Sequence, residues 1–299
     1  MTHESSSYCR RSLQVPRLAL FLALFLNTFI RMSLIAAEPD VNGLMNDALL
    51  AKQQNDYTRA LALASKAVEA APTDAKVYFL RGELYSDTHQ PARAVTDFDK
   101  VLKLQPLSTL AFQRRGVEHF KLGHIKESIA DFDAYLKAVP SSEPHHWQRG
   151  IAYYYAERYD DGRRQFELHQ TVNPNDVENA VWHFLCVARK DGIDKARAAL
   201  IPIEGDRRVP MKEVYNVFAG KAKPEAVLQA VKNGNPPPAE FNQRMFYANL
   251  YLGLYYEALR DAGQARDYIA KAAEQAASGG YMGAVARVHA QLFRAGRKY

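Results

Sequence analysis

The stretch YFLRGELYSDTHQPARAVTDFDKVLKLQP, residues 78–106, decides the fold of this 299-residue chain. Apolar residues recur at spacings of three and four on both sides of a short polar break, which is typical of two amphipathic helices. Gly82 in the first helix lets the second helix approach closely. Pro106 ends the second helix, because proline has no amide hydrogen and clashes with the preceding turn. The stretch therefore predicts a helical hairpin.

This hairpin recurs along the chain with a period of 34 residues. The period links prolines, glycines that each follow an arginine, and phenylalanines: Pro72, Pro106, Pro140 and Pro174; Gly82, Gly116 and Gly150; Phe98, Phe132 and Phe166. A single hairpin cannot bury its apolar face, so neighbouring copies stack into a solenoid. The spacing predicts four copies over residues 41–174, beginning near 41, 75, 109 and 143, and an all-α superhelix.

The repeat weakens after residue 174. Over 175–239 we expect a divergent helical segment, in which Phe184 replaces the glycine and prolines leave short helices near 210–219 and 223–233. Over 240–299 we expect a last hairpin with helices near 240–261 and 263–277, because Gly253 and Ala265 keep the spacing of Gly82 and Ala94. Residues 281–295 predict a closing helix over the exposed last face.

The first 37 residues have the pattern of a secretory signal. Three arginines precede an apolar run from Leu18 to Ile30, and Ala36 and Ala37 follow it. This run is shorter than the ~20 residues of a spanning helix. We expect cleavage near Ala37, with an uncleaved anchor as the alternative, and a location in the periplasm, outside the cell or elsewhere in the cell envelope.

The positions of the cysteines and the balance of charges argue against lipidation, a disulfide and a nucleic-acid partner. Cys9 precedes the apolar run, so the sequence does not support lipidation, and Cys186 alone leaves no partner for a disulfide in the mature chain. Four arginines and Glu4 fall within the first 37 residues, so the remainder has 35 basic and 32 acidic side chains. This balance argues against nucleic acid as a partner.

The 34-residue period, with YFLRGELY and ARAVTDFDKVLKLQP, resembles the tetratricopeptide repeat (TPR). The order of the segments, with WHFLCVARKDGIDKARAAL at 182–200 and FYANLYLGLYYEALRDAGQARDYIAKAAE at 246–274, resembles the bacterial lipoprotein NlpI family. That resemblance implies a dimeric cell-envelope adaptor that brings together enzymes such as a carboxy-terminal processing protease or peptidoglycan hydrolases. The missing lipidation cysteine departs from the family.

In stacked hairpins the first helix of each repeat faces the concave side. Its outward positions predict a groove that binds a protein or peptide partner through aromatic anchors. The predicted groove residues are Phe79, Glu83, Gln113, Arg114, Val117, Phe120, Trp147, Gln148, Ile151, Tyr154 and Tyr155. The alternative is that the aromatic residues pack against the next repeat. Lysines and asparagines that would clamp a terminal carboxylate are absent from these positions.

Arginines precede the repeated glycines at an inward position, and aspartates lie on the partner helices. We expect ion pairs within repeats, Arg81 with Asp97 and Arg115 with Asp131. Gln165 replaces the third aspartate, so Arg149 is expected to turn elsewhere.

No catalytic motif, metal site or cofactor site is predicted. The sequence has no GxSxG, phosphate-binding loop or HExxH motif. His119 and His124 are five residues apart across a turn and do not have zinc-ligand spacing. The favoured function is an exported protein-binding scaffold and not an enzyme. One alternative is a structural homo-oligomer of the envelope with contacts through Tyr247, Leu250, Tyr251 and Leu254, and a minor alternative is an uncharacterised enzyme.

Overall fold

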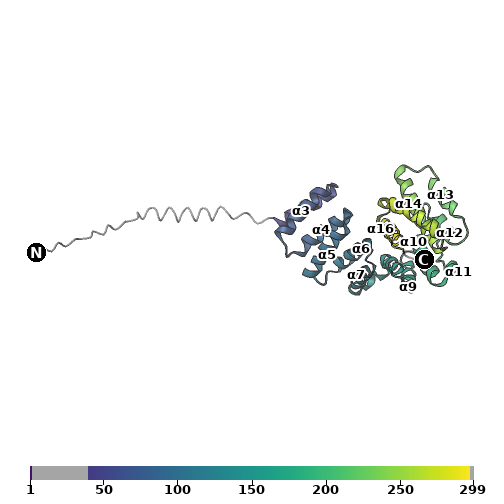
Figure 1. The fold of residues 1–299 in the computed structure, drawn as a ribbon, viewed down its shortest axis with the longest axis horizontal. Helices are drawn as coiled ribbons and strands as arrows, with labels where there is room; N and C mark the ends of the chain where they lie inside the picture. Colours follow the sequence, from purple (N-terminus) through teal and green to yellow (C-terminus); the bar gives the residue numbers. More distant parts are fainter. Residues whose placement is uncertain (2–39, 297–299) are drawn as a thin grey trace.

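The computed structural model of the chain describes Met1 and residues 40–296. The predicted signal peptide, residues 1–37, therefore lies outside the described residues except for Met1. Residues 40–296 form helices joined by short loops, with no strand among them. No helix in this part of the chain combines the length and hydropathy needed to cross a membrane. The fold is an all-α superhelix, as the repeats predict (Figure 1).

Four helical hairpins form the first part of the superhelix. They pair α2 (Val41–Gln53) with α3 (Tyr57–Ala70), α4 (Ala75–Asp87) with α5 (Pro91–Leu104), α6 (Thr109–Lys121) with α7 (Ile125–Ala138), and α8 (Trp147–Tyr155) with α9 (Tyr159–Gln170). The first residues of α2, α4 and α6 coincide with the expected repeat starts. Helix α8 begins at Trp147 instead of near 143, because a 3₁₀ turn over Pro140–His145, with Pro144 inside it, precedes α8.

The second part is gathered more closely around a common core. It contains α10 (Val177–Asp191), α11 (Ile193–Ala198), α12 (Met211–Phe218), α13 (Pro224–Lys232), α14 (Pro238–Ala258), α15 (Ala262–Glu274) and α16 (Gly280–Arg294). Helices α12 and α13 lie where the prolines predicted short helices. One large apolar core extends from α6 to α16, whereas the first two hairpins use two smaller clusters. Most of the buried apolar side chains therefore belong to the core that extends from α6 to α16.

The repeated glycines and phenylalanines pack directly on each other. A Cβ atom added to Gly82 would lie 2.9 Å from Cε1 of Phe98, and one added to Gly116 would lie 2.7 Å from Cε1 of Phe132. Such distances are too short for a real side chain, so only glycine leaves room for the ring. Glycine and phenylalanine keep a constant separation along the sequence because the two residues contact each other inside each hairpin.

The predicted ion pairs within repeats are confirmed. A guanidinium nitrogen of Arg81 lies 2.7 Å from Oδ1 of Asp97, and the equivalent contact from Arg115 to Asp131 is 2.6 Å. Both aspartates are buried, so the pairs keep these carboxylates from being unpaired in the core.

Arg149, the third of these arginines, bonds to several partners, as the replacement of the third aspartate by Gln165 predicts. Arg149 donates hydrogen bonds to Oε1 of Gln165 and also forms ion pairs with Asp133 and Glu143.

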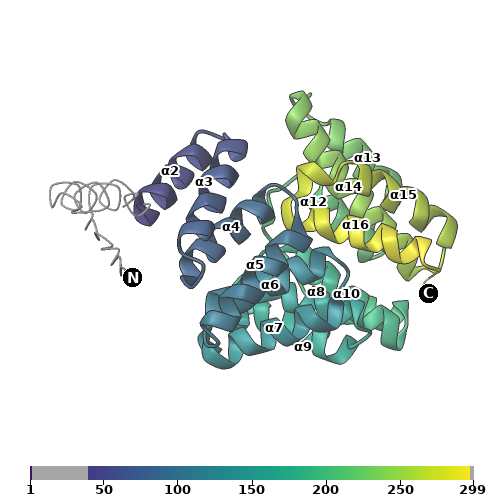
Figure 2. The same cartoon turned by 60° about the vertical axis from the view of Figure 1, so that its left-hand side comes forward.

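Helix α16 lies in the concave face of the third and fourth repeats, and not only over the last hairpin as expected. The ring of Tyr281 lies against both Phe120 of α6 and Trp147 of α8, with centroids 5.2 and 5.1 Å away. Further along α16, Nδ1 of His289 lies 2.9 Å from the hydroxyl of Tyr155. Figure 2 shows α16 running beside α8 and α10. The chain therefore fills half of its own concave face.

Candidate functional site

Four of the predicted groove residues are buried and do not form an open surface. Phe120 is 0% exposed, Ile151 and Tyr154 are each 1% exposed, and Tyr155 is 6% exposed. The prediction that they are accessible anchors is wrong. The physical reason is tertiary packing, since α16 covers Phe120 and Tyr155 while Trp182 of α10 contacts the ring of Tyr154.

The remaining predicted residues keep part of their surface exposed. Phe79, Glu83, Gln113, Arg114 and Val117 lie on α4 and α6, and Trp147 and Gln148 begin α8. Side chains of Arg114 and Glu83 form an ion pair of 2.9 Å, and the Arg114 side chain is 56% exposed. This pair is partly exposed, and ion pairs near the surface contribute little to stability.

The same column of positions continues onto α2. Met45 and Leu49 precede Phe79 and Glu83 by one repeat period, and Leu49 is 42% exposed. We call Met45, Leu49, Phe79, Glu83, Arg114 and Val117 the open concave surface. It combines apolar side chains with one exposed charge pair, and α16 does not contact it through any ring or hydrogen bond within the described residues.

His146 lies between the open concave surface and the part of the concave face that α16 fills, where it joins α6 to the start of α8. Its Nδ1 accepts a hydrogen bond from the amide of Arg149 at the start of α8, while its Nε2 lies 2.6 Å from Oε1 of Gln113. These contacts fit a neutral ring with the proton on Nε2. Burial, with a contribution from Arg149, lowers the pKa of His146 to about 4.

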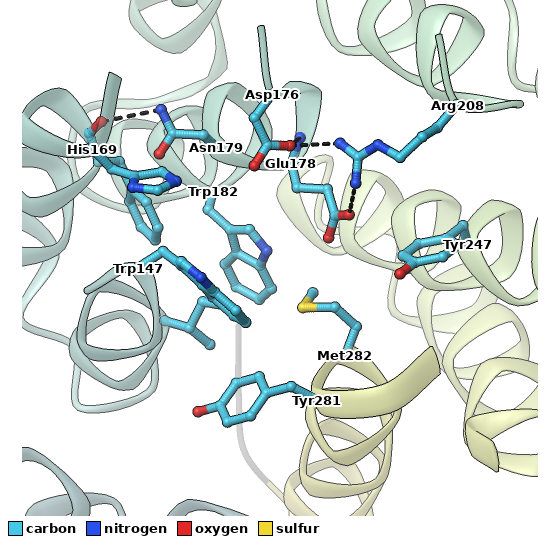
Figure 3. A pocket seen from close by; sticks show the side chains of 12 residues that line it. Trp147, His169, Asp176, Glu178, Asn179, Trp182, Arg208, Tyr247, Tyr281 and Met282 are labelled. Atoms are coloured by element: carbon cyan, nitrogen blue, oxygen red, sulfur yellow. Dashed lines mark hydrogen bonds and ion pairs between the residues drawn. The ribbon is translucent and has the colours of Figure 1, made fainter. Parts of the chain in front are cut away.

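A cavity of about 310 Å³ opens between the fourth repeat and the second half of the chain (Figure 3). Its walls come from α8, α9, α10, α14, α16 and the segment before α12. The lining residues are Trp147, Ile151, Phe166, His169, Asp176, Glu178, Asn179, Trp182, Arg208, Tyr247, Tyr281 and Met282. Trp147 therefore belongs both to the predicted groove and to this cavity.

Arg208 connects three carboxylates at one side of the cavity. Its guanidinium lies 2.6 Å from Asp176, 2.5 Å from Glu178 and 2.6 Å from Asp206. Although burial opposes its charge, these carboxylates keep the pKa of Arg208 above its usual range. Burial raises the pKa of Glu178. The charge of Arg208 and the hydrogen bond from the Tyr251 hydroxyl lower this pKa and so oppose the effect of burial. The group carries more negative than positive charge.

Several positions important for these contacts were not found from the sequence. Glu178, Asn179 and Trp182 lie on a helix that was recognised only by its spacing, and Arg208 lies in a segment without helical periodicity. One sequence signal was available, because the two tryptophans of the whole chain, Trp147 and Trp182, both line the cavity.

Other predicted sites can be compared with the structure. Leu250, Tyr251 and Leu254 are 0% exposed inside this chain, so their interpretation as contacts between copies is wrong. They are buried because α14 packs against α15, α13 and α10, and on the α10 side the Tyr251 hydroxyl donates to Glu178 at 2.6 Å. Within residues 40–296 no three His, Cys, Asp or Glu side chains form a group that could hold a metal ion.

Tandem helical hairpins of this kind define a repeat-protein scaffold, a class that presents surfaces instead of a single pocket. The model of the tetratricopeptide repeat family matches residues 45–86 and 79–143. The chain thus contains tetratricopeptide repeats, and proteins built from these repeats mediate protein–protein interactions and bind peptides.

The human protein DnaJ homolog subfamily C member 3 is 31% identical to this chain over 84 residues, which are 28% of this chain and 17% of that protein. This chain therefore matches less than a fifth of the relative's length.

Among solved structures, a tetratricopeptide repeat protein from Parabacteroides merdae ATCC 43184 has a TM-score of 0.55 and 15% identity, over 85% of this chain and 98% of that chain. A MamA chain from Desulfovibrio magneticus RS-1 has a TM-score of 0.50 and 23% identity, over 54% of this chain and 92% of that chain. At these identities the likeness shows the fold alone.

Proposed function

We propose that the chain is an exported adaptor that binds a segment of a partner protein on the open concave surface. One observation carries this proposal: the other half of the same concave face already holds a helix, α16, through the rings of Phe120 and Trp147. The curvature and spacing of these hairpins therefore accommodate a helix. Recognition of a helix in a groove is a recurring mode of peptide binding.

The composition of the open concave surface supports the same function. Leu49 and the partly buried Phe79 supply apolar contacts, and the partly exposed pair of Glu83 and Arg114 supplies charges of both signs. Apolar anchors provide most of the binding free energy in such interfaces, while charged side chains at the rim fix orientation. The surface suits an amphipathic segment with mixed charge.

Export and a role in the cell envelope are part of the proposal. The arginines, apolar run and alanines of residues 1–37 support secretion. The resemblance of the segment order to NlpI supports a partner such as an envelope protease or a peptidoglycan hydrolase. Fusion of residues 1–37 to a reporter enzyme that is active only outside the cytoplasm tests export. An inactive reporter would contradict it.

Partner binding is tested by two matched double variants. Leu49→Ser with Arg114→Glu changes the open concave surface, whereas Leu50→Ser with Lys103→Glu makes the same chemical changes at exposed positions on other faces. Crosslinked partners are purified from cells and quantified by mass spectrometry. We expect at least fivefold lower recovery with the first variant and wild-type recovery with the second. Equal recovery with all three proteins, each folded by circular dichroism, would reject binding at this surface.

A further inference from the structure

The charges around the cavity favour a positive ligand. Arg208 is the single guanidinium of the group and is already paired with Asp176, Glu178 and Asp206. The carboxylates outnumber this guanidinium, and amides at the start of α10 stabilise two of them, since Val177 donates to Asp206 and Glu178 to Asp176. An anionic ligand would meet carboxylates that already hold Arg208, whereas a cation would meet a favourable field.

The walls of the cavity favour a cation on a hydrocarbon stem. Trp147, Trp182, Tyr247 and Tyr281 turn aromatic rings toward the space between them (Figure 3). The faces of aromatic rings attract ammonium and guanidinium groups, and this attraction increases where water is displaced. A compact inorganic cation would leave most of this apolar wall without contact.

Asn179 presents an acceptor that has no protein partner. Its Nδ2 donates to the carbonyl of Phe166 and to Oε1 of Gln170, and Gln170 is itself fixed because its Nε2 donates to Pro174. This chain of amides places Oδ1 of Asn179 as the remaining acceptor. It is buried and finds no hydrogen-bond partner among residues 40–296. A buried acceptor without a partner is destabilising, and a ligand N–H would relieve that cost.

His169 and Trp182 add complementary groups. Nδ1 of His169 bonds to the carbonyl of Pro144 at 2.8 Å, which leaves Nε2 as an acceptor in the neutral ring. Nε1–H of Trp182 is a buried donor with no acceptor within the described part of the chain. A ligand that carries N–H donors together with a carbonyl oxygen would match both kinds of group.

We propose that this cavity binds a basic residue, arginine or lysine, of a partner polypeptide. The cationic head lies near the carboxylates and Asn179, the stem lies between the rings, and a main-chain carbonyl accepts from Trp182. The proposal rests on the proposed function only in that the ligand is a polypeptide segment. Trp147 lines the cavity and also contacts Tyr281 of α16, so the cavity borders the part of the concave face that α16 fills.

Tryptophan fluorescence tests this proposal, because both tryptophans of the chain line the cavity. The full mature chain is titrated with the peptide acetyl-Gly-Arg-Gly-amide, its lysine counterpart, and a citrulline counterpart that keeps the shape of arginine without the charge. We expect a saturable change in emission with the basic peptides and at least tenfold weaker binding of the citrulline peptide. No response to the basic peptides, or equal binding of all three, would overturn the proposal.

Variants locate the binding at the cavity. Glu178→Gln is expected to weaken the arginine peptide at least fivefold, whereas the same change at the exposed Glu127 of α7 should leave binding unchanged. Trp147→Leu should weaken binding and Trp147→Phe should retain most of it, with Trp182 as the remaining reporter. Binding that is insensitive to all of these changes would contradict the assignment.

Two further measurements separate the possible outcomes. Tetramethylammonium is a small organic cation without a peptide group, and binding of this probe without binding of the basic peptides would make the occupant a free cation and reject a polypeptide. The Leu49→Ser, Arg114→Glu variant changes only the open concave surface and should bind the arginine peptide normally. Failure of the cavity proposal and failure of partner capture at the open concave surface are therefore distinguishable.

Discussion

The ring of Tyr281 stacks on the ring of Phe120, with centroids 5.2 Å apart and planes inclined by 24°. This contact joins α16, near the end of the chain, to α6 in the third repeat. Phe120 also meets Tyr155 edge to face at 5.6 Å, and Tyr155 in turn contacts His289 of α16. Phe120 is therefore the centre of the contact between the concave face and the helix that fills it.

Replacement of Phe120 by alanine should destabilise the chain and loosen α16. Loss of a fully buried phenylalanine costs roughly 3–5 kcal/mol of unfolding free energy. Urea denaturation measures this loss. Hydrogen exchange should show that the substitution accelerates exchange of the α16 amides more than exchange of the α3 amides. Leu110→Ala on the same helix is the control, because Leu110 is 58% exposed. A loss below about 1 kcal/mol for Phe120→Ala would show that α16 does not depend on this contact.

The hairpins could be predicted from the sequence because their determinants are local. Gly116 and Phe132 contact each other within one hairpin, and their period reveals every copy. The location of α16 could not be predicted in the same way. Its apolar residues predict an amphipathic helix, but which apolar face covers Tyr155 depends on contacts between distant parts of the chain.

The cavity was missed for a related reason. Arg208 meets Asp176 and Glu178 only because the irregular segment before α12 returns to the start of α10. No periodic pattern marks such a return. The sequence predicts Trp147, Tyr154 and Tyr155 as groove residues, but it does not show that helices α10 and α16 pack on them.

His146 should make the stability of the chain sensitive to acid. Its pKa is lowered by burial from 6.5 to about 4 in the folded chain. Between these values the unfolded chain binds a proton that the folded chain does not, so the unfolding free energy decreases as the pH falls through this window. The expected contribution is roughly 2–3 kcal/mol, complete near pH 4. Burial also lowers the pKa of His119 and His183, which adds to the loss.

His146→Asn isolates the contribution of this residue. Asparagine accepts the hydrogen bond of a helix start as well as histidine does, but it does not titrate. Urea denaturation at pH values from 7 to 4 should therefore show a smaller loss of stability for this variant than for the wild type. His145→Asn changes the exposed neighbour and should retain the wild-type slope. If His146→Asn loses as much stability as the wild type, the ring is protonated without penalty in the folded chain.

The turns inside successive hairpins use a left-handed residue at the same repeat position. The φ angles are 59° at Asn55, 57° at His89 and 75° at Gly123. Glycine adopts this conformation without steric cost, whereas a Cβ atom is unfavourable there. His89→Gly should increase the unfolding free energy by roughly 0.5–1 kcal/mol, and Gly123→Ala should decrease it by about the same amount. Thermal unfolding of both variants checks the opposite signs, and a shift in the same direction for both would contradict the argument.

Removal of α16 should uncover the apolar half of the concave face. A chain that ends at Gln275 would expose Phe120 and Tyr155, which contact α16 and are buried in the complete chain. Exposed apolar patches of this kind bind hydrophobic dyes and promote self-association. We expect increased dye fluorescence, a lower thermal midpoint, and sedimentation as larger species.

A synthetic peptide of residues 280–294 should reverse these changes when it is added to the shortened chain. The rings of Tyr281 and His289 would return to Phe120 and Tyr155, so the peptide should bind saturably and suppress dye binding. A peptide with Tyr281→Ala and His289→Ala is the matched control, because it keeps the helix-forming residues but lacks both contacts. Equal suppression by the two peptides would mean that the concave face does not recognise α16 through these residues. Selective suppression would show that this face binds a helix supplied in trans, which is the capacity required of the open concave surface.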